Sequence, residues 1–392
     1  MTYSVPERWR FAISDEELAR RWDKVRAAMA EEEIDCLVLN AYDNMLGGYL
    51  RWFTDIPVAD YPLSVLFHRE DDMTFIGHGG TGGRSIAASL ARGIGDAPAT
   101  PMMPTLYYTD RYVPDLMIES IRKRGYKKVG FVALATIPAN MYKYLTEELH
   151  GVEFVDATEM VDYIKAIKSP EEIQRIRWSA AVHDKLYAAM PAIFRPDRYE
   201  YEITNDIRAL GGELGAECIV NISIGTDPNT PVKGVVPWQY RRTRMGDKMS
   251  CLIERNGPGG YYSEALRTLV LGEPPKEYVD AAETAAKCLD LIASMMKPGA
   301  KCPDLFRANN EYLVAHGYLP EGRLFGHGQG YDMVERPAFV PAETMELAEN
   351  MYVACHPGAV TDKVVGLSCS NFLITKDGCE RVTPTPNGLI VC

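Results

Sequence analysis

The chain lacks the basic charge and the long apolar runs that nucleic-acid-binding and membrane proteins carry. Its 392 residues include 42 Lys and Arg against 54 Asp and Glu, which gives a net charge of −12 at pH 7, and no basic stripe is present. Because nucleic acids and anionic membranes bind basic surfaces, we expect neither as a partner. No run approaches the roughly 18 apolar residues of a membrane span, and the segment after Met1 lacks the apolar core of a signal peptide.

Paired cysteines, repeats and low-complexity tracts are missing too. The nine cysteines are an odd number, are scattered along the chain and include no CxxC motif. This pattern indicates reduced thiols rather than a disulfide framework, so we expect a cytoplasmic protein. With 46% apolar and 24% charged residues, the composition is that of a globular protein without disordered regions.

The chain is too long for one ordinary core, and two domains are expected. In the first half, strand-like runs alternate with helical patterns, which predicts an α/β domain up to about residue 160. The strand-like runs are 34–39, 63–67, 73–76, 129–132 and 153–155, and the helical patterns are 16–32, 82–92, 115–124 and 139–148. A clear helix start follows, because the capping residue Ser169 precedes Pro170 and two glutamates. We place the boundary just before it and predict domains at 1–165 and 166–392.

The second half has helices and strands in separate runs. The expected helices are 170 to about 194, 201–214, 276–296 and 304–316, and the expected strands lie near 218–224, in a hairpin at 247–271, and at 352–355 and 371–375. Segregated runs of this kind predict an α+β domain in which helices cover a curved antiparallel sheet.

Two motifs in the second half are the most informative part of the chain. Residues 326–337 read GHGQGYDMVERP, and residues 355–358 read CHPG. Further pieces in order are IKSPEEI at 167–173, GYYS at 260–263, RTLVLG at 267–272, MKPG at 296–299, NMY at 350–352 and LIT at 373–375. Together they resemble the pita-bread family of creatinase, aminopeptidase P, prolidase and methionine aminopeptidase over nearly the whole chain. The resemblance implies an α+β pita-bread domain at the C-terminus, an N-terminal α/β creatinase-like domain, and a homodimer.

The resemblance also identifies five positions that bind two divalent metal ions in the metal-dependent members of the family. There they are two aspartates, a histidine and two glutamates, and the paired ions activate water and polarise a carbonyl. Here the positions fall at or near Glu254, and on Glu264, His327, His356 and Cys369, with Ser370 as the alternative to the last. Only His327 keeps the family's residue. Because hard cations depend on carboxylate charge, we expect no metal pair.

Two other family histidines are missing. Val334 stands where one precedes the Glu-x-Pro of residues 335–337, and the loop at 225–231 contains none. Family-type peptidase activity is therefore not expected. The chain instead resembles creatinase and ectoine hydrolase, members that lack the metals and cleave carbon–nitrogen bonds in small nitrogenous molecules with His and Glu as acid and base.

Our main hypothesis is a metal-independent hydrolase, without a cofactor, that cleaves a C–N bond in a small polar nitrogenous substrate. His327 or His356 would be the base, because imidazole titrates near physiological pH. Glu264 would orient the substrate or activate water, and neighbouring His and Glu side chains can separate into an acid and a base. The candidate catalytic residues are His327, His356, Glu264, Glu254 and Glu335, and the candidate substrate-binding residues are Tyr262, Cys369, Arg336, Asp60 and Tyr61.

The candidates also have structural interpretations. His356, Tyr262 and Cys369 could be core residues, and the glutamates could be exposed or pair with a neighbouring arginine. His327 differs, because its flanking glycines let backbone approach closely and rarely suit a core histidine. Residues 60–61 are included because in creatinase-like dimers, which this chain resembles, the matching segment of one subunit helps to close the partner's pocket.

Three alternatives stay open. Glu264, His327, His356 and Cys369 could hold one softer ion, zinc or iron, tetrahedrally. The same proton-abstracting groups could run a lyase reaction, as in the dimethylsulfoniopropionate lyases that share this fold. The chain could also be a non-catalytic binding module, as some pita-bread proteins are, although a binder has no need of His and Glu at the former metal positions.

Overall fold

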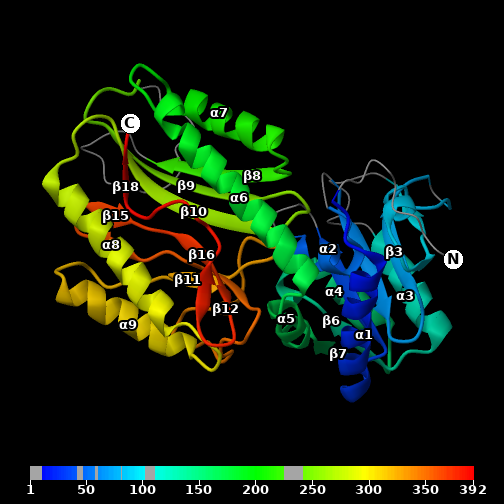
Figure 1. Ribbon diagram of the computed structural model, residues 1–392. Coiled ribbons are helices and arrows are strands. Elements are labelled where there is room, and N and C mark those ends of the chain that lie inside the picture. The colour runs from blue at the N-terminus through cyan, green and yellow to red at the C-terminus, as the bar shows by residue number, and fades with distance from the viewer. Residues whose placement is uncertain (1–10, 42–46, 58–60, 81, 102–110, 225–241) are drawn as a thin grey trace. The chain divides into compact units, whose positions relative to one another are not determined.

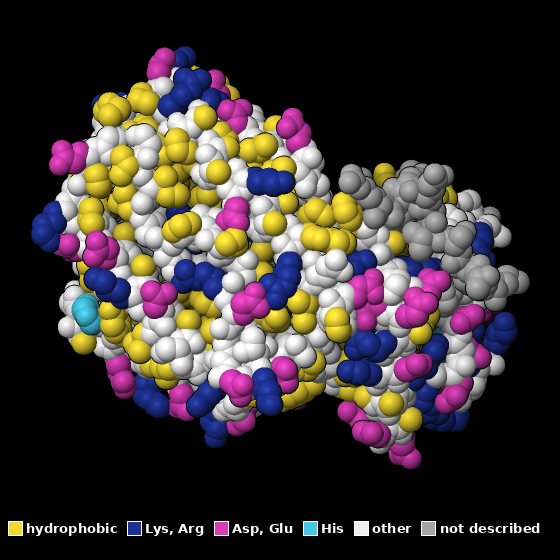
Figure 2. All heavy atoms as spheres, viewed as in Figure 1, with side chains coloured by type: hydrophobic (Ala, Val, Ile, Leu, Met, Phe, Trp, Pro, Cys, Tyr) yellow, Lys and Arg dark blue, Asp and Glu magenta, His cyan; other side chains and the backbone are white. Residues whose placement is uncertain are grey.

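The computed structural model describes the chain apart from residues 1–10, 42–46, 58–60, 81, 102–110 and 225–241, and apart from the side chains of 218–224. The chain divides into two compact units, Met1–Lys165 and Ala166–Cys392 (Figure 1). Among the described helices, none combines the length and the apolar character needed to cross a membrane. On the face drawn in Figure 2, Lys and Arg side chains are interspersed with Asp and Glu rather than gathered in a stripe.

The N-terminal unit is a mixed sheet with helices packed against it. The strands lie in the order β4-β3-β2-β1-β6-β7, with β5 beside β3, and β1 pairs antiparallel with β2 and parallel with β6. The strands are β1 (Cys36–Ala41), β2 (Leu63–His68), β3 (Met73–His78), β4 (Ile94–Asp96), β5 (Ala99–Thr100), β6 (Lys128–Phe131) and β7 (Glu153–Asp156). The helices are α1 (Asp15–Glu31), α2 (Gly48–Thr54), α3 (Tyr112–Arg124), α4 (Ala139–Glu148) and α5 (Thr158–Ala166).

Capping and apolar spacing explain the first helix of this unit. Ser14 Oγ accepts from Glu17 N and so caps α1, whose buried face follows the helical period. The helix predicted at 82–92 is wrong, since only the short 3₁₀ helix η1 (Ala87–Leu90) forms there. Gly82 has a φ of +75°, which an α-helix excludes, and the preceding glycines form a turn closed by a hydrogen bond from Gly83 N to Gly80 O.

The C-terminal unit places two main sheets between two pairs of helices (Figure 1). One sheet has the order β18-β10-β9-β8 and the other β12-β11-β13-β16-β17, and β14 and β15 form a separate pair. The helices are α6 (Pro170–Ile193), α7 (Glu200–Glu213), α8 (Lys276–Met295) and α9 (Cys302–Ala315). The strands are β8 (Cys218–Ile224), β9 (Lys248–Asn256), β10 (Tyr262–Val270), β11 (Gly326–Gly328), β12 (Glu335–Ala338), β13 (Tyr352–Cys355), β14 (Gly358–Val360), β15 (Val365–Leu367), β16 (Ser370–Ile374), β17 (Cys379–Arg381) and β18 (Leu389–Val391).

Each sheet of this unit has its own core. Leu186 of α6 and Ile203 of α7 pack with the buried side of β9 and β10, whereas Leu289 of α8 and Leu305 of α9 pack with β13 and β16. The start of α6 is a complete capping box between Ser169 and the glutamate three residues later, as the sequence predicts.

The two sheets meet where β10 passes β11 and β16. Leu266 of β10 and Cys369, next to β16, form an isolated bridge. Beside it the fully buried Arg267 donates to the carbonyl oxygens of Leu266, Cys369, Thr385 and Pro386 and to Ser370 Oγ. All of its guanidinium N–H groups are therefore used to hold the two sheets together, and the polar cluster described next lies at this junction.

Candidate active site

Glu254 and Glu264 lie directly opposite each other on the β9–β10 hairpin. Side chains alternate along a strand, and Ile253 and Ala265 pack on the α6 side, so the two glutamates point to the opposite face, toward the second sheet. Glu254 is 6% and Glu264 is 2% exposed. The alternative that Glu264 is an exposed strand residue is therefore wrong.

His327 sits in β11 between two glycines that the packing requires. A Cβ at Gly328 would lie 2.2 Å from the carbonyl oxygen of Arg336, and one at Gly326 would lie 2.5 Å from the ring of Phe339. The His327 Nδ1 atom is 2.9 Å from Gly328 O. Because a carbonyl oxygen only accepts, Nδ1 carries a hydrogen, and the other ring nitrogen, Nε2, lies 3.9 Å from Glu264 Oε1.

His356 follows β13 and is held by a hydrogen bond from its backbone N to Phe325 O. Its half-buried ring lies 5.3 Å from the His327 ring, centroid to centroid. Burial lowers the pKa of His356 to about 4, and the neighbouring His327 adds to this effect while Glu264 opposes it. The imidazole is therefore neutral at pH 7 and able to accept a proton.

Cys369 completes the cluster from the β16 side. Its fully buried Sγ donates a hydrogen bond of 3.0 Å to Glu264 Oε1. Burial raises the pKa of this thiol well above its usual range, and the charge of Glu264 raises it further. Cys369 is therefore a protonated donor to Glu264 and not a nucleophilic thiolate.

The two carboxyl groups differ in protonation. The pKa of Glu254 is raised well above its usual range by burial first, then by the charge of Glu264 and the hydrogen bond between the two groups. Burial also opposes ionisation of Glu264, yet the adjacent His327 and His356 and the hydrogen bonds from Glu254 and Cys369 hold its pKa below its usual range. The pair thus carries one proton, on Glu254, and one negative charge, on Glu264.

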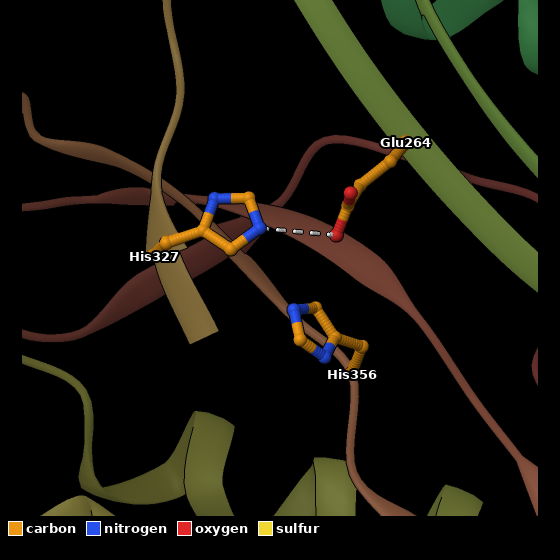
Figure 3. A group of neighbouring side chains, drawn as sticks. All are labelled: Glu264, His327 and His356. Atoms are coloured by element: carbon orange, nitrogen blue, oxygen red, sulfur yellow. Dashed lines mark ion pairs between the residues drawn. The ribbon is translucent and has the colours of Figure 1, made fainter. Parts of the chain in front are cut away.

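Glu264, His327 and His356 converge on one point, as Figure 3 shows. One ligand atom from each lies within 4.8 Å of the others. Within the described residues, neither Lys nor Arg forms an ion pair with Glu254 or Glu264. This negatively charged cluster can therefore bind a cationic group or a single metal ion.

Two buried amides, Gln329 and Asn371, belong to the site and were not among the candidates. Asn371 Oδ1 accepts from Glu264 N at 2.7 Å, and Asn371 Nδ2 donates to Gln329 Oε1 at 2.8 Å. Gln329 Nε2 in turn donates to Glu254 Oε1 at 3.3 Å. A signal was present in the sequence, since Gln329 is a polar residue between the glycines of GHGQG and Asn371 directly precedes the apolar run at 372–374.

Glu335 and Arg336 have partners outside the cluster. Lys168 Nζ lies 3.0 Å from Glu335 Oε2, and Arg336 forms an ion pair with Glu343. The pairing of Glu335 with its neighbour Arg336 stays an interpretation, and the structure adds Lys168 as a partner of Glu335. Their catalytic and substrate-binding roles stay predictions.

Of the other candidates, Tyr262 and Tyr61 are described and Asp60 is not. Tyr262 is buried in β10, where its backbone N donates to Gly330 O at 2.7 Å. Tyr61 belongs to the N-terminal unit, where its ring lies 5.0 Å from that of His78. Asp60 and the loop at 225–231 lie outside the described residues. Val334 is exposed, at the position where the sequence comparison expects a histidine.

Comparison with known proteins places both units in known families. Residues 174–376 match metallopeptidase family M24, and residues 21–167 match the creatinase/prolidase N-terminal domain. Ectoine hydrolase of Halomonas elongata is 25% identical, with 96% of this chain and 97% of that protein aligned. An uncharacterised hydrolase/peptidase of Sinorhizobium fredii is also 25% identical, with 96% of each aligned.

Solved structures show the same fold. The prolidase from Pyrococcus horikoshii OT3 has a TM-score of 0.76 at 20% identity and covers 95% of this chain and 100% of its own. The prolidase from Thermococcus sibiricus has a TM-score of 0.78 at 16% identity, with 97% and 100% covered. These matches confirm the resemblance and the fold class predicted from the sequence: an N-terminal α/β creatinase-like domain with a C-terminal α+β pita-bread domain.

Proposed function

Because the chain belongs to metallopeptidase family M24, we propose that it is a hydrolase that cleaves a C–N bond in a small, polar, nitrogenous molecule. Relatives named as hydrolases and peptidases support a hydrolase in general. The similarity of ectoine hydrolase over nearly the full length of both chains supports a small-molecule substrate. Peptides are the alternative substrate class to be tested against this proposal, because several similar proteins are named as prolidases and dipeptidases.

The observation that carries the proposal is the Glu264 carboxylate, buried between two imidazoles and without a Lys or Arg counter-ion in the described part of the chain. A buried negative charge of this kind is stabilised by a ligand cation. We therefore favour substrates in which the C–N bond belongs to an amidinium or guanidinium group, since that cation can pair with Glu264 beside the two bases.

In the proposed mechanism His327 is the base. Its Nδ1–H is held by Gly328 O, which leaves the Nε2 lone pair beside Glu264. Nε2 takes a proton from water, the water oxygen bonds to the substrate carbon, and the electron pair of the broken C–N bond goes to nitrogen. The imidazolium then returns its proton to that nitrogen. Glu264 holds the substrate cation, and His356 is a second proton acceptor.

The convergence of Glu264, His327 and His356 favours a second candidate, a hydrolase with one transition-metal ion. The donor set differs from that of the family's metal pair, because Glu254, Glu264, His356 and Cys369 stand where the family has two aspartates and two glutamates. One carboxylate with two imidazoles is, by contrast, a ligand set of catalytic zinc sites. These three residues would hold the ion, which would supply Lewis-acid activation of water or substrate.

Metal content separates the two candidates. The purified protein would be dialysed without chelator and analysed for transition metals, together with His356→Ala and the matched surface control His316→Ala, whose side chain is exposed on the end of α9. Content far below one equivalent supports the metal-independent hydrolase. One equivalent of zinc or iron that is lost only in His356→Ala supports the second candidate. Two equivalents in the unchanged protein would contradict both.

A substrate screen tests the hydrolase itself. Ectoine, guanidino compounds, simple amides and Xaa-Pro dipeptides would be incubated with the enzyme, and products would be detected by mass spectrometry. We expect turnover of an amidine or guanidine and not of dipeptides, with a loss of about 10²- to 10⁴-fold in His327→Ala. Turnover of dipeptides alone would refute the proposed substrate class.

We also propose that the enzyme is a cytoplasmic homodimer. The cysteines in the described part of the chain are free thiols, which supports a reducing compartment. Sedimentation equilibrium and cell fractionation test these points, and a monomer or a secreted protein would contradict them.

A further inference from the structure

Two buried amide side chains link the backbone of Glu264 to the carboxyl group of Glu254 through a chain of hydrogen bonds. The chain runs from the backbone N of Glu264 to Asn371, from Asn371 to Gln329, and from Gln329 to the carboxyl group of Glu254. Glu254 and Glu264 stand opposite each other on the β9–β10 hairpin, and this pairing closes the ring.

The direction of this ring is fixed by the backbone. Glu264 N–H can only donate, so Asn371 must present Oδ1 to it and Nδ2 to the next partner. Gln329 must accept from Asn371 through Oε1, which leaves Nε2 to donate to Glu254. Neither amide can turn over without breaking a bond at each end.

The surroundings keep the two amides in place. Both Gln329 and Asn371 are fully buried. Gln329 N donates to Tyr352 O, and Asn371 N donates to Thr383 Oγ1. Because burying an amide without hydrogen-bond partners costs free energy, the surroundings favour the side-chain orientations found in the ring.

We propose that Gln329 and Asn371 are positioning residues that hold the Glu254–Glu264 pair in one orientation, with Glu264 Oε1 toward His327. Gln329 follows His327 by two residues on the same segment, so a single backbone element sets both the base and the donor to Glu254. The inference rests on the proposed function in one respect only, namely that hydrolysis is the reaction for which the pair is held.

The chain offers a sharp spectroscopic test, because it has three glutamines, Gln174, Gln239 and Gln329. Protein labelled with ¹⁵N in glutamine side chains therefore gives at most three amide pairs by NMR. The Gln329 pair is assigned by its loss in Gln329→Leu. Asn371→Asp still accepts from Glu264 N but cannot donate to Gln329, so it should turn the Gln329 amide and shift its signals.

Asn309→Leu is the matched control. Asn309 is a fully buried amide in α9 of the same unit, hydrogen-bonded to Cys288 and Asn310 and outside the ring. We expect the Gln329 amide protons to exchange slowly with solvent, to shift in Asn371→Asp, and to be unchanged in Asn309→Leu. Fast exchange, or no shift in Asn371→Asp, would overturn the inference whatever the enzyme hydrolyses.

Measurements of kcat and KM test the positioning role separately from the NMR experiment. On a substrate that the unchanged enzyme hydrolyses, Gln329→Leu should lower kcat by about 10- to 100-fold, as loss of a supporting shell does elsewhere, with a smaller change in KM. Asn309→Leu should leave kcat unchanged. An intact ring by NMR with an unchanged kcat in Gln329→Leu would show that the amides are structural only. If nothing is hydrolysed, the proposed function fails, and the NMR result still decides whether the ring exists.

Discussion

Replacing Glu254 by glutamine tests the proton that the carboxyl pair carries. The amide of Glu254→Gln can reproduce the neutral carboxyl group, with its oxygen accepting from Gln329 and its NH₂ donating to Glu264. The substitution therefore removes one titration and leaves the hydrogen bonds in place. If Glu254→Gln changes the free energy of unfolding by different amounts at different pH values, that difference therefore reports the proton bound to Glu254.

The magnitude follows from linkage between folding and proton binding. The pKa of Glu254 is raised in the folded protein by burial and by Glu264, whereas a carboxyl in the unfolded chain titrates near about 4.3. Above that pH the unfolded chain releases a proton that the folded protein keeps. The free energy of unfolding then falls with pH by about 1.4 kcal/mol per unit, until the folded pKa is reached.

The pH dependence of stability in the unchanged protein does not isolate the contribution of Glu254, because His356 also titrates. Burial lowers its folded pKa to about 4 from the ordinary value of 6.5, so between these values the unfolded chain binds a proton that the folded protein does not. Stability therefore rises with pH through this window, which opposes the effect of Glu254. The quantity to measure is the difference between Glu254→Gln and the unchanged protein, in which the His356 contribution cancels.

Hydrogen exchange of β9–β10 peptides in urea, read by mass spectrometry at pH 5, 6 and 7, reports stability of the unit that contains Glu254. We expect Glu254→Gln to gain relative stability with pH, by at most about 2.7 kcal/mol over these two units. Glu343→Gln is the matched control, because Arg336 and backbone N–H groups outweigh burial and hold its pKa at about 2, so its difference should stay constant. If the stability difference between Glu254→Gln and the unchanged protein stays the same from pH 5 to pH 7, the prediction that folded Glu254 keeps a proton is refuted.

Three further predictions concern stability and reactivity. Gly328→Ala should lower the free energy of unfolding by about 1–3 kcal/mol or more, because the added Cβ meets Arg336 O, whereas Gly378→Ala, with nothing within 4 Å, should change little in the same urea titration. Arg267→Lys should lower the free energy of unfolding by at least about 2 kcal/mol, because lysine keeps the charge but leaves buried carbonyl oxygens unpaired. Equal stability in the urea titration would contradict the role of Arg267 in holding the two sheets together. Iodoacetamide should label Cys369 only after unfolding, because burial keeps the thiol protonated and inaccessible; peptide mapping of native protein that shows fast labelling would disprove this.

Local signals in the sequence predicted much of the fold. Ser169 and Pro170 marked the start of α6, and the apolar alternation marked the β9–β10 hairpin, because caps and strand periodicity depend on near neighbours. The family motif likewise identified His327, whose flanking glycines the packing requires. Helix 82–92 failed because glycines in a turn outweighed the apolar spacing.

The contacts within the site could not be predicted in the same way. Gln329 and Asn371 are 42 residues apart, and Lys168 and Glu335 are 167 apart, so no local pattern connects them. The sequence alone therefore did not predict Lys168 as a partner of Glu335. The protonation of Glu254 also depends on the register that brings Glu264 opposite it, which residue types alone do not reveal.

The β9–β10 hairpin carries the two glutamates on one face and the buried Arg255 on the other, within the apolar core that packs against α6, and its register keeps these charges apart. On the side opposite the two glutamates, the fully buried Arg255 donates to Ser179 O of α6, and Ser263 Oγ lies 2.7 Å from Ser179 Oγ. A one-residue slip of a strand exchanges its faces. A one-residue insertion in the turn at 257–261 would thus bring an arginine to the side that faces the second sheet and send a carboxyl group against α6. The length of this turn, more than any single side chain near it, determines whether the site is anionic.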